Sequence, residues 1–221
     1  MLPTVVFDVN ETLLDLASVR TWFGTEFDDP ALAGAWFDEV LRLSFVSSVT
    51  NRYVPFTELA GHALTSTVGH DVHADTMNQI RSILTTLPAH PDVIPGLTML
   101  TGAGYSIAAL TNSPRTTAVA QLTNAGIADT FDAILSVEMV QRFKPHHSVY
   151  EAAAEHLSIQ PSSLVMVAAH DWDVAGAMAT GCKGVFVTRG GRTYSSAFPD
   201  PTLIAADIHD AAHRISQIPD F

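Results

Sequence analysis

The sequence predicts an α/β fold: a Rossmann-like, mostly parallel sheet core with a helical subdomain inserted after the first strand. Short runs of β-branched and other apolar residues recur along the chain with polar residues after them, as in strands buried on both faces. Helical patterns separate these runs, and such alternation is typical of right-handed βαβ crossovers. One long stretch near the N-terminus lacks strand-like runs and carries apolar residues at helical spacing instead.

The first strand is expected at Thr4–Phe7, continuing to Val9 around Asp8, because TVVF is a short β-branched run. Helices are expected at Thr116–Asn124, which Gly126 closes, and at His147–His156, which ends before a proline. After Arg192 the sequence loosens into Ser, Pro and Asp before a last short helix, and no function is predicted there. Further strands are expected at Tyr105–Leu110, Ala133–Leu135, Leu164–Ala169 and Gly184–Val187.

The strand-free stretch predicts a helical cap at residues 16–88, between two core segments at residues 1–15 and 89–221. Leu32, Trp36, Val40 and Leu43 recur on one helical face within it. A proline-rich connection at 87–95 marks its end. Several aromatic residues of the stretch are expected either to form the core of this helix bundle or to exclude water from a neighbouring site; examples are Trp36, Phe45, Tyr53 and Phe56.

Composition excludes several classes of protein. With 221 residues, 47% of them apolar and 15% charged, the chain has material for a substantial core and is not expected to be disordered. A net charge of −12 and only two lysines, Lys144 and Lys183, argue against nucleic-acid binding. A single cysteine, Cys182, cannot form an internal disulfide, which favours a cytoplasmic location. No apolar run approaches the roughly 20 residues of a membrane span, and no export signal is recognised.

Polar residues follow four of the predicted strands. Ligands of open parallel sheets bind beyond the carboxyl ends of the strands, so we expect these groups to meet at one rim. Taken singly, each has a structural explanation: Asp8 capping a turn, Thr111 capping a helix, Lys144 in solvent, and Asp173 at a helix N-terminus. The four groups are Asp8 to Thr12, Thr111 to Ser113, Lys144 with Pro145, and His170 to Asp173.

In order and spacing these groups resemble the haloacid dehalogenase (HAD) superfamily, and within it the type II L-2-haloacid dehalogenases. The resemblance implies the HAD fold, with the cap at the insert. It also implies that Asp8 is the nucleophile with Thr12 beside it, that Lys144 is the cation next to the nucleophile, and that Asp173 holds or activates the hydrolytic water. The motifs that carry it are FDVNETL at 7–13, LTNS at 110–113, KPH at 144–146 with Tyr150, and DWD at 171–173 before GA at 176–177.

Further roles follow from the same resemblance. It implies that Thr111 and Asn112 bind the substrate carboxylate or the nucleophile, and that Tyr150 lies in or behind the pocket. Arg42, in the cap, takes the place of the substrate-binding arginine. His170 stands where these dehalogenases usually have Asn, and it is expected either to bind substrate or to be a loop histidine without a direct role.

Departures from the pattern separate two activities. Superfamily phosphatases carry an acid two residues after the nucleophile, where this chain has Asn10. These phosphatases usually hold Mg²⁺ through an aspartate four residues before the position of Asp173, where this chain has Ala169. Halide leaves without a proton or a metal. The expected function is therefore hydrolytic dehalogenation of a short 2-haloacid through an ester on Asp8, with no cofactor and no metal. The alternative is a Mg²⁺-dependent phosphatase acting on a small metabolite. The resemblance also suggests a homodimer.

Overall fold

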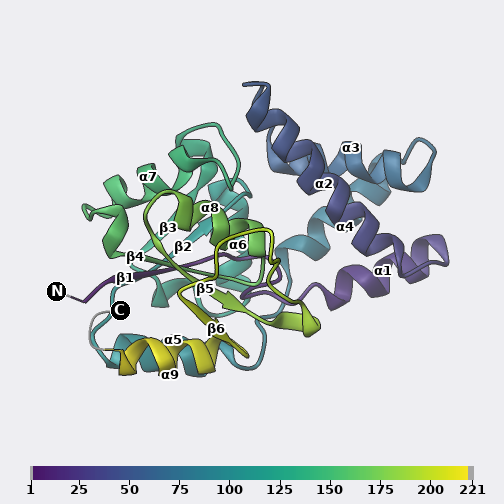
Figure 1. Cartoon of the computed structure of the whole chain (residues 1–221). Helices are drawn as coiled ribbons and strands as arrows, with labels where there is room; N and C mark the ends of the chain where they lie inside the picture. The colour runs from purple at the N-terminus through teal and green to yellow at the C-terminus, as the bar shows by residue number, and fades with distance from the viewer. Residues whose placement is uncertain (1, 219–221) are drawn as a thin grey trace.

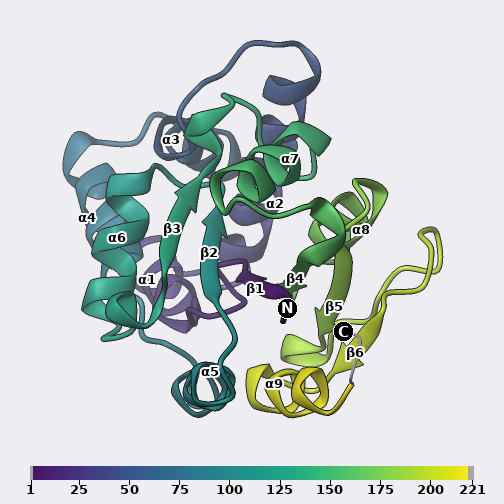
Figure 2. The same cartoon turned by 90° about the vertical axis from the view of Figure 1, so that its left-hand side faces the viewer.

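The computed structural model describes residues 2–218, in which a six-stranded parallel sheet has the strand order β3-β2-β1-β4-β5-β6. Figures 1 and 2 show the sheet with helices on both of its sides. The elements are β1 (Thr4–Phe7), α1 (Ala17–Phe27), α2 (Leu32–Val49), α3 (Phe56–Val68), α4 (Ala74–Thr85), α5 (Val93–Gly102), β2 (Ile107–Thr111), α6 (Arg115–Asn124), β3 (Ala133–Ser136), α7 (His147–His156), β4 (Leu164–Ala168), α8 (Asp171–Ala179), β5 (Lys183–Val187), β6 (Leu203–Ala205) and α9 (Ile208–Gln217).

The predicted α/β class is confirmed, and the expected strands appear within two residues of their predicted bounds. One strand was missed: β6 pairs in parallel with β5 at the edge of the sheet. Its three residues include the exposed Ile204, and so short an edge strand gives too little periodicity for detection from sequence.

β1 lies at the centre of the sheet, between β2 and β4. Val5, Val6 and Phe7 are fully buried, which explains the unbroken apolar run. Phe7 is in register with Ala109 of β2 and with Val167 of β4. The polar residues that follow these three strands therefore emerge at the same level.

The helices α1 to α4 follow β1 in the chain and lie to one side of the sheet; we call residues 17–85 the helical insert (Figure 1). Its α2 and α3 pack against each other, and Trp36 Nε1 donates a hydrogen bond to the carbonyl of Ala60 between them. Phe45 meets Trp172 of α8, while Tyr53 and Phe56 meet Phe143 before α7. These insert aromatics thus join the insert to the sheet-bearing part rather than only filling a bundle.

Arg189 links the loop after β1 to the helices α5 and α9. Its guanidinium forms a two-pronged ion pair with Asp92, both N–O distances being 2.7 Å, and also donates to the carbonyl of Thr12. Asp92 in turn accepts from the backbone N–H of Ile208, at the start of α9. One arginine therefore fixes the loop after β1 relative to α5 and α9. None of the helices within residues 2–218 is long and apolar enough to cross a membrane.

Replacing Gly96 with alanine should destabilise the fold. Helices α5 and α9 pack together below the strands in Figure 1, and a Cβ at Gly96 would lie 2.7 Å from the carbonyl oxygen of Ile208. We expect Gly96→Ala to lower the free energy of unfolding by about 1–3 kcal/mol, measured by urea denaturation. Gly34→Ala in α2 is the control, because a Cβ there meets nothing within 4 Å; it should be neutral or stabilising. Equal midpoints for Gly96→Ala and wild type would contradict this packing.

Candidate active site

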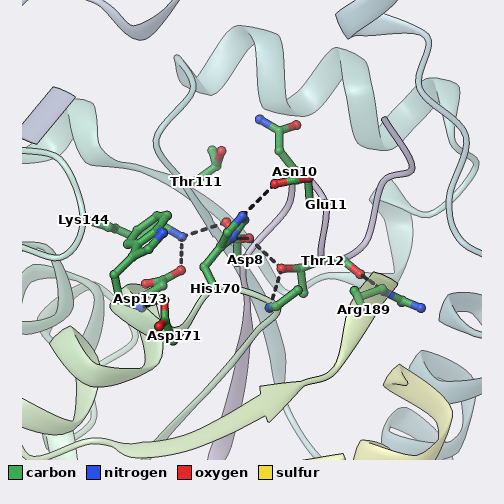
Figure 3. A network of polar contacts seen from close by, with 12 residues as sticks. Asp8, Asn10, Glu11, Thr12, Thr111, Lys144, His170, Asp171, Asp173 and Arg189 are labelled. Atoms are coloured by element: carbon green, nitrogen blue, oxygen red, sulfur yellow. Dashed lines mark hydrogen bonds and ion pairs between the residues drawn. The ribbon is translucent and has the colours of Figure 1, made fainter. Parts of the chain in front are cut away.

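Asp8 lies at the carboxyl end of β1, and its carboxylate is the centre of a polar network (Figure 3). The side chain is 8% exposed. Lys144 Nζ donates to Asp8 Oδ1 at 2.9 Å, whereas Thr12 Oγ1 donates to Oδ2 at 2.6 Å. His170 Nδ1 lies 3.1 Å from the same Oδ2. Three donors from three separate segments thus hold one carboxylate.

Lys144 is fully buried, which is rare for lysine without paired charges. Besides Asp8, its ammonium donates to Asp173 Oδ2 at 2.6 Å and to the carbonyl of Leu110 at 2.9 Å. Burial by itself would lower the pKa of Lys144, but the carboxylates of Asp173 and Asp8 raise it above its ordinary value. The lysine is therefore charged, and the interpretation of Lys144 as a solvated side chain is wrong.

The two carboxylates beside Lys144 differ in character. Burial would raise the pKa of Asp8, but Lys144 and His170 hold that pKa well below its usual range, so Asp8 is ionised. Burial raises the pKa of Asp173, and the charge of Asp8 raises it further against the attraction of Lys144. Asp8 thus suits a nucleophile, whereas Asp173 suits a group that accepts a proton.

His170 joins Asp8 to Glu11. Its Nε2 lies 2.9 Å from Glu11 Oε2, and Glu11 Oε1 accepts from Arg192 at 2.7 Å. Burial would lower the pKa of His170, but hydrogen bonds to Asp8 and Glu11 raise it to about 9. The imidazole therefore carries a charge near neutral pH, with a proton on each nitrogen.

The other expected site residues support this network from behind. Asn112 Oδ1 accepts from the backbone N–H of Lys144 at 3.0 Å, and Thr111 Oγ1 accepts from the N–H of Ser113 at 3.1 Å. Tyr150 is fully buried and donates to Asp173 Oδ1 at 2.7 Å. Of the two expected placements, in the pocket or behind it, Tyr150 therefore has the second, since its hydroxyl holds Asp173 rather than facing a substrate.

The structure does not bring Arg42 to the network. Its side chain is 60% exposed and forms an ion pair with Glu39 on the same helix, at 2.6 Å. The helical turn is the reason: Phe37 and Leu41, four residues apart, face the pocket beside His170, and Arg42 follows about 100° further round α2. The assignment of Arg42 to the substrate is therefore wrong for this conformation.

Sequence reasoning missed Phe37, Arg189 and Arg192, and gave Glu11 no role. Phe37 stacks on His170 with 6.1 Å between ring centroids, so the insert reaches the network through an aromatic ring. Glu11 has a φ of 63°, in the left-handed region that glycine favours. The signal that could have drawn attention to Glu11 is a glutamate at such a position directly after a strand. Nothing local marks either arginine, because both come from the segment after β5.

A cavity of about 190 Å³ lies between the helical insert and core residues that include Asn10, Ser113 and Gln121. Apolar side chains line most of it, and Asn10 and Ser113 form its edge near the strand ends. Gln121 Nε2 donates to Asn10 Oδ1 at 3.1 Å and so orients that amide. The apolar lining includes Trp36, Phe37, Phe56, Met77, Ile80 and Leu84.

Comparison with known proteins agrees with this geometry. A family model described as haloacid dehalogenase-like hydrolase matches residues 2–181. The chain belongs to this hydrolase family. Among curated relatives, the (S)-2-haloacid dehalogenase of Xanthobacter autotrophicus is 30% identical over 86% of this chain and 76% of its own length. That of Pseudomonas sp. (strain YL) is 29% identical over 89% and 87%.

A solved structure shares the fold of this family member. It is L-2-haloacid dehalogenase from Xanthobacter autotrophicus with chloropropionic acid covalently bound. The TM-score is 0.90 at 23% identity, and the match covers 97% of this chain and 98% of the other. Family membership thus rests on the sequence matches, and the structural match confirms the fold.

The network makes a prediction for stability against pH. His170 has a folded-state pKa near 9, above its ordinary 6.5, so its charge stabilises the fold below pH 6.5 and this contribution is lost as pH rises through 9. The contribution is on the order of 3 kcal/mol. We expect His170→Asn to remove this loss from thermal unfolding measured between pH 6 and 10. His209→Asn, at an exposed position on α9, should retain the wild-type slope. A wild-type slope in His170→Asn would show that His170 is not charged in the fold.

Proposed function

We propose that this chain is a hydrolytic dehalogenase that cleaves the carbon–halogen bond of short 2-haloalkanoic acids. The reaction would form an ester on Asp8 and release halide, and then give the 2-hydroxy acid. The observation that carries the proposal is a buried, ionised Asp8 carboxylate two residues before Asn10, which lines an apolar cavity and stands where the phosphatase pattern has an acid. The relatives named above are 2-haloacid dehalogenases, which supports the same substrate class.

In the first step, Asp8 displaces halide from the substrate carbon, which forms the carbon–oxygen bond of the ester. Oδ2 already accepts from Thr12 and His170, whereas Oδ1 accepts from Lys144. Each carboxylate oxygen has about two acceptor sites, so Oδ1 retains one for the attack. We therefore assign Oδ1 as the nucleophilic atom. The charge on Lys144 keeps it ionised.

In the second step, water attacks the carbonyl carbon of the ester, and the bond from that carbon to Oδ1 breaks. Asp173 is the base in this proposal, because its raised pKa favours taking a proton from water. Tyr150 and Lys144 fix its two oxygens at 2.7 and 2.6 Å. Asp173 returns this proton to the former Oδ1, which leaves as the hydroxyl oxygen of the product. The new Asp8 carboxyl, which now contains the oxygen of water, loses its remaining proton to solvent and is again a carboxylate.

We propose that the helical insert serves as a cap, and that the cavity beneath it holds the alkyl part of the substrate. An apolar, water-poor cavity strengthens the interactions among Asp8, Lys144 and the reacting carbon. Arg81 also lines this cavity. It is the arginine that we propose for the substrate carboxylate in place of Arg42. Thr111 and Asn112 contribute by holding the loops beneath the substrate.

The alternative, a Mg²⁺-dependent phosphatase, fits these residues poorly. No group of three or more His, Cys, Asp or Glu side chains within residues 2–218 is arranged to hold a metal ion. The oxygens of Asp8 and Asp173 that face each other are both bonded to the ammonium of Lys144. Asn10 and Ala169 stand where the phosphatase pattern has carboxylates. The ammonium of Lys144 thus supplies, between Asp8 and Asp173, the positive charge that a metal ion would otherwise supply.

Asp8→Asn should abolish turnover, because the change is nearly isosteric but removes the nucleophilic carboxylate. We expect halide release from 2-chloropropionate below about a hundredth of the wild-type rate, since covalent catalysis supplies several kcal/mol. Asp200→Asn, on an exposed loop, is the matched control and should keep full activity. Wild-type halide release by folded Asp8→Asn would refute the nucleophile.

Halide release should survive a chelator, because Lys144 takes the position between the two carboxylates. The assay compares halide release from 2-chloropropionate with hydrolysis of p-nitrophenyl phosphate, each with and without EDTA. Unchanged dehalogenation in EDTA is the expected result. Phosphatase activity that EDTA abolishes, without any halide release, would replace our proposal with the phosphatase.

A further inference from the structure

We propose that His170 and Thr12 form an oxyanion hole for the second half of the reaction, and that Glu11 positions His170 for this task. The inference rests on the proposed ester mechanism. It goes further because it assigns His170 and Glu11 to a specific step. Neither is the proposed nucleophile Asp8, the cation Lys144 or the base Asp173. His170 would act as a catalytic residue, and Glu11 as a positioning residue.

The geometry at Asp8 separates its two oxygens. Oδ2 accepts from Thr12 Oγ1 at 2.6 Å and lies 3.1 Å from His170 Nδ1, so both of its acceptor sites are used. The backbone N–H of Ala169 donates to Thr12 Oγ1 at 3.0 Å, which directs the hydroxyl proton toward Asp8. If Oδ1 carries the ester, Oδ2 is its carbonyl oxygen. Both donors are then in place before water attacks.

Charge on Oδ2 changes in opposite directions in the two steps. Formation of the ester turns a carboxylate into a neutral group, so donors at Oδ2 lose an anion and disfavour this step. Attack of water moves the carbonyl electron pair onto Oδ2, and donors there stabilise the resulting oxyanion. When this tetrahedral intermediate collapses, the electron pair on Oδ2 re-forms the carbonyl, and the bond from the carbon to Oδ1 breaks. His170 therefore assists hydrolysis of the ester and not its formation.

His170 stands where the dehalogenase pattern usually has Asn, and its outer nitrogen contacts Glu11. Glu11 occupies a left-handed backbone conformation, which is strained for a residue other than glycine. Its carboxylate compensates by pairing with His170 at 2.9 Å and with Arg192 at 2.7 Å. Since carboxylates lie at both ring nitrogens, each nitrogen carries a proton. Nδ1 therefore donates to Asp8.

Two aromatic rings fix the plane of the imidazolium. Trp172 stacks on one side with 5.0 Å between centroids and Phe37 stacks at 6.1 Å, with interplanar angles of 28° and 29°. Aromatic faces attract a cation, so both rings favour the charged form. The charged groups around His170 are Asp8 and Glu11 after β1, Lys144 beyond Asp8, Asp171 and Asp173 of α8, Asp38 of α2, and Arg192 beyond Glu11.

The test separates ester formation from ester hydrolysis in His170→Ala, which leaves no side-chain donor at this position. Rapid-quench assays measure the first turnover of halide from 2-chloropropionate, and intact-protein mass spectrometry detects the ester on Asp8. We expect a halide burst of one equivalent at the wild-type rate or faster, followed by hydrolysis slowed about 100-fold, with the ester accumulating. His209→Ala, at its exposed position, should show neither change.

Glu11→Gln provides a second variant in which the imidazole remains. We expect the alkaline limit of ester hydrolysis to move to lower pH, while the halide burst keeps its wild-type pH dependence. A purely structural role for Glu11 would change both steps alike. Nitrogen NMR of the His170 ring gives an independent reading: both nitrogens should be protonated at pH 7.5 in the wild type and should lose a proton at lower pH in Glu11→Gln.

Three results would overturn the inference. Equal loss of burst and turnover in His170→Ala, without accumulated ester, would place His170 in the first step. Ester hydrolysis at the wild-type rate in His170→Ala would remove it from catalysis, and a neutral His170 ring in the wild type would exclude the charged donor. A wild-type protein that forms no ester from any 2-haloacid would contradict the proposed function itself, so the two failures are distinguishable.

Discussion

The ammonium of Lys144, enclosed between two buried carboxylates, is the interaction on which this site depends. Removing an ammonium from water costs several kcal/mol, and attraction to a neighbour repays it only when the geometry is good. Here Asp8, Asp173 and the carbonyl of Leu110 surround Nζ at 2.6–2.9 Å. Three strands supply these partners, since they follow or end β1, β2 and β4. The charge therefore also fixes the distances between the strand ends, and with them the positions of the Asp8 and Asp173 carboxylates.

The central place of β1 makes that arrangement possible. A parallel sheet aligns carboxyl ends, and the register of Phe7 with Ala109 and Val167 brings the following residues to one level. Arg189 then limits the movement of the loop after β1 by holding the Thr12 carbonyl and Asp92 together. Rigid placement matters because a nucleophile and its donors act only within fractions of an ångström of the correct geometry.

The helical insert reaches this framework through aromatic side chains. Phe37 stacks on His170, Phe45 meets Trp172 and Tyr53 meets Phe143, and Phe37 also belongs to the apolar lining that the insert gives the cavity. The charge on His170 is maintained by Asp8 and Glu11 rather than by solvent. An imidazolium and an ammonium thus lie on opposite oxygens of the Asp8 carboxylate. This division lets one oxygen react while the other remains hydrogen-bonded.

The sequence alone determined the α/β class, the position of the helical insert and the grouping of Asp8, Thr12, Lys144 and Asp173, because apolar periodicity and strand-end residues are local signals. It did not determine β6, whose three residues are too short to show a period. It placed Arg42 at the substrate, although a helix rotates each residue by about 100° and only packing decides which face turns inward. The partners of Glu11 and His170 come from segments about 160 to 180 residues apart, and only the fold brings them together. Tertiary structure therefore decided which charges meet, since burial and distance set their strength.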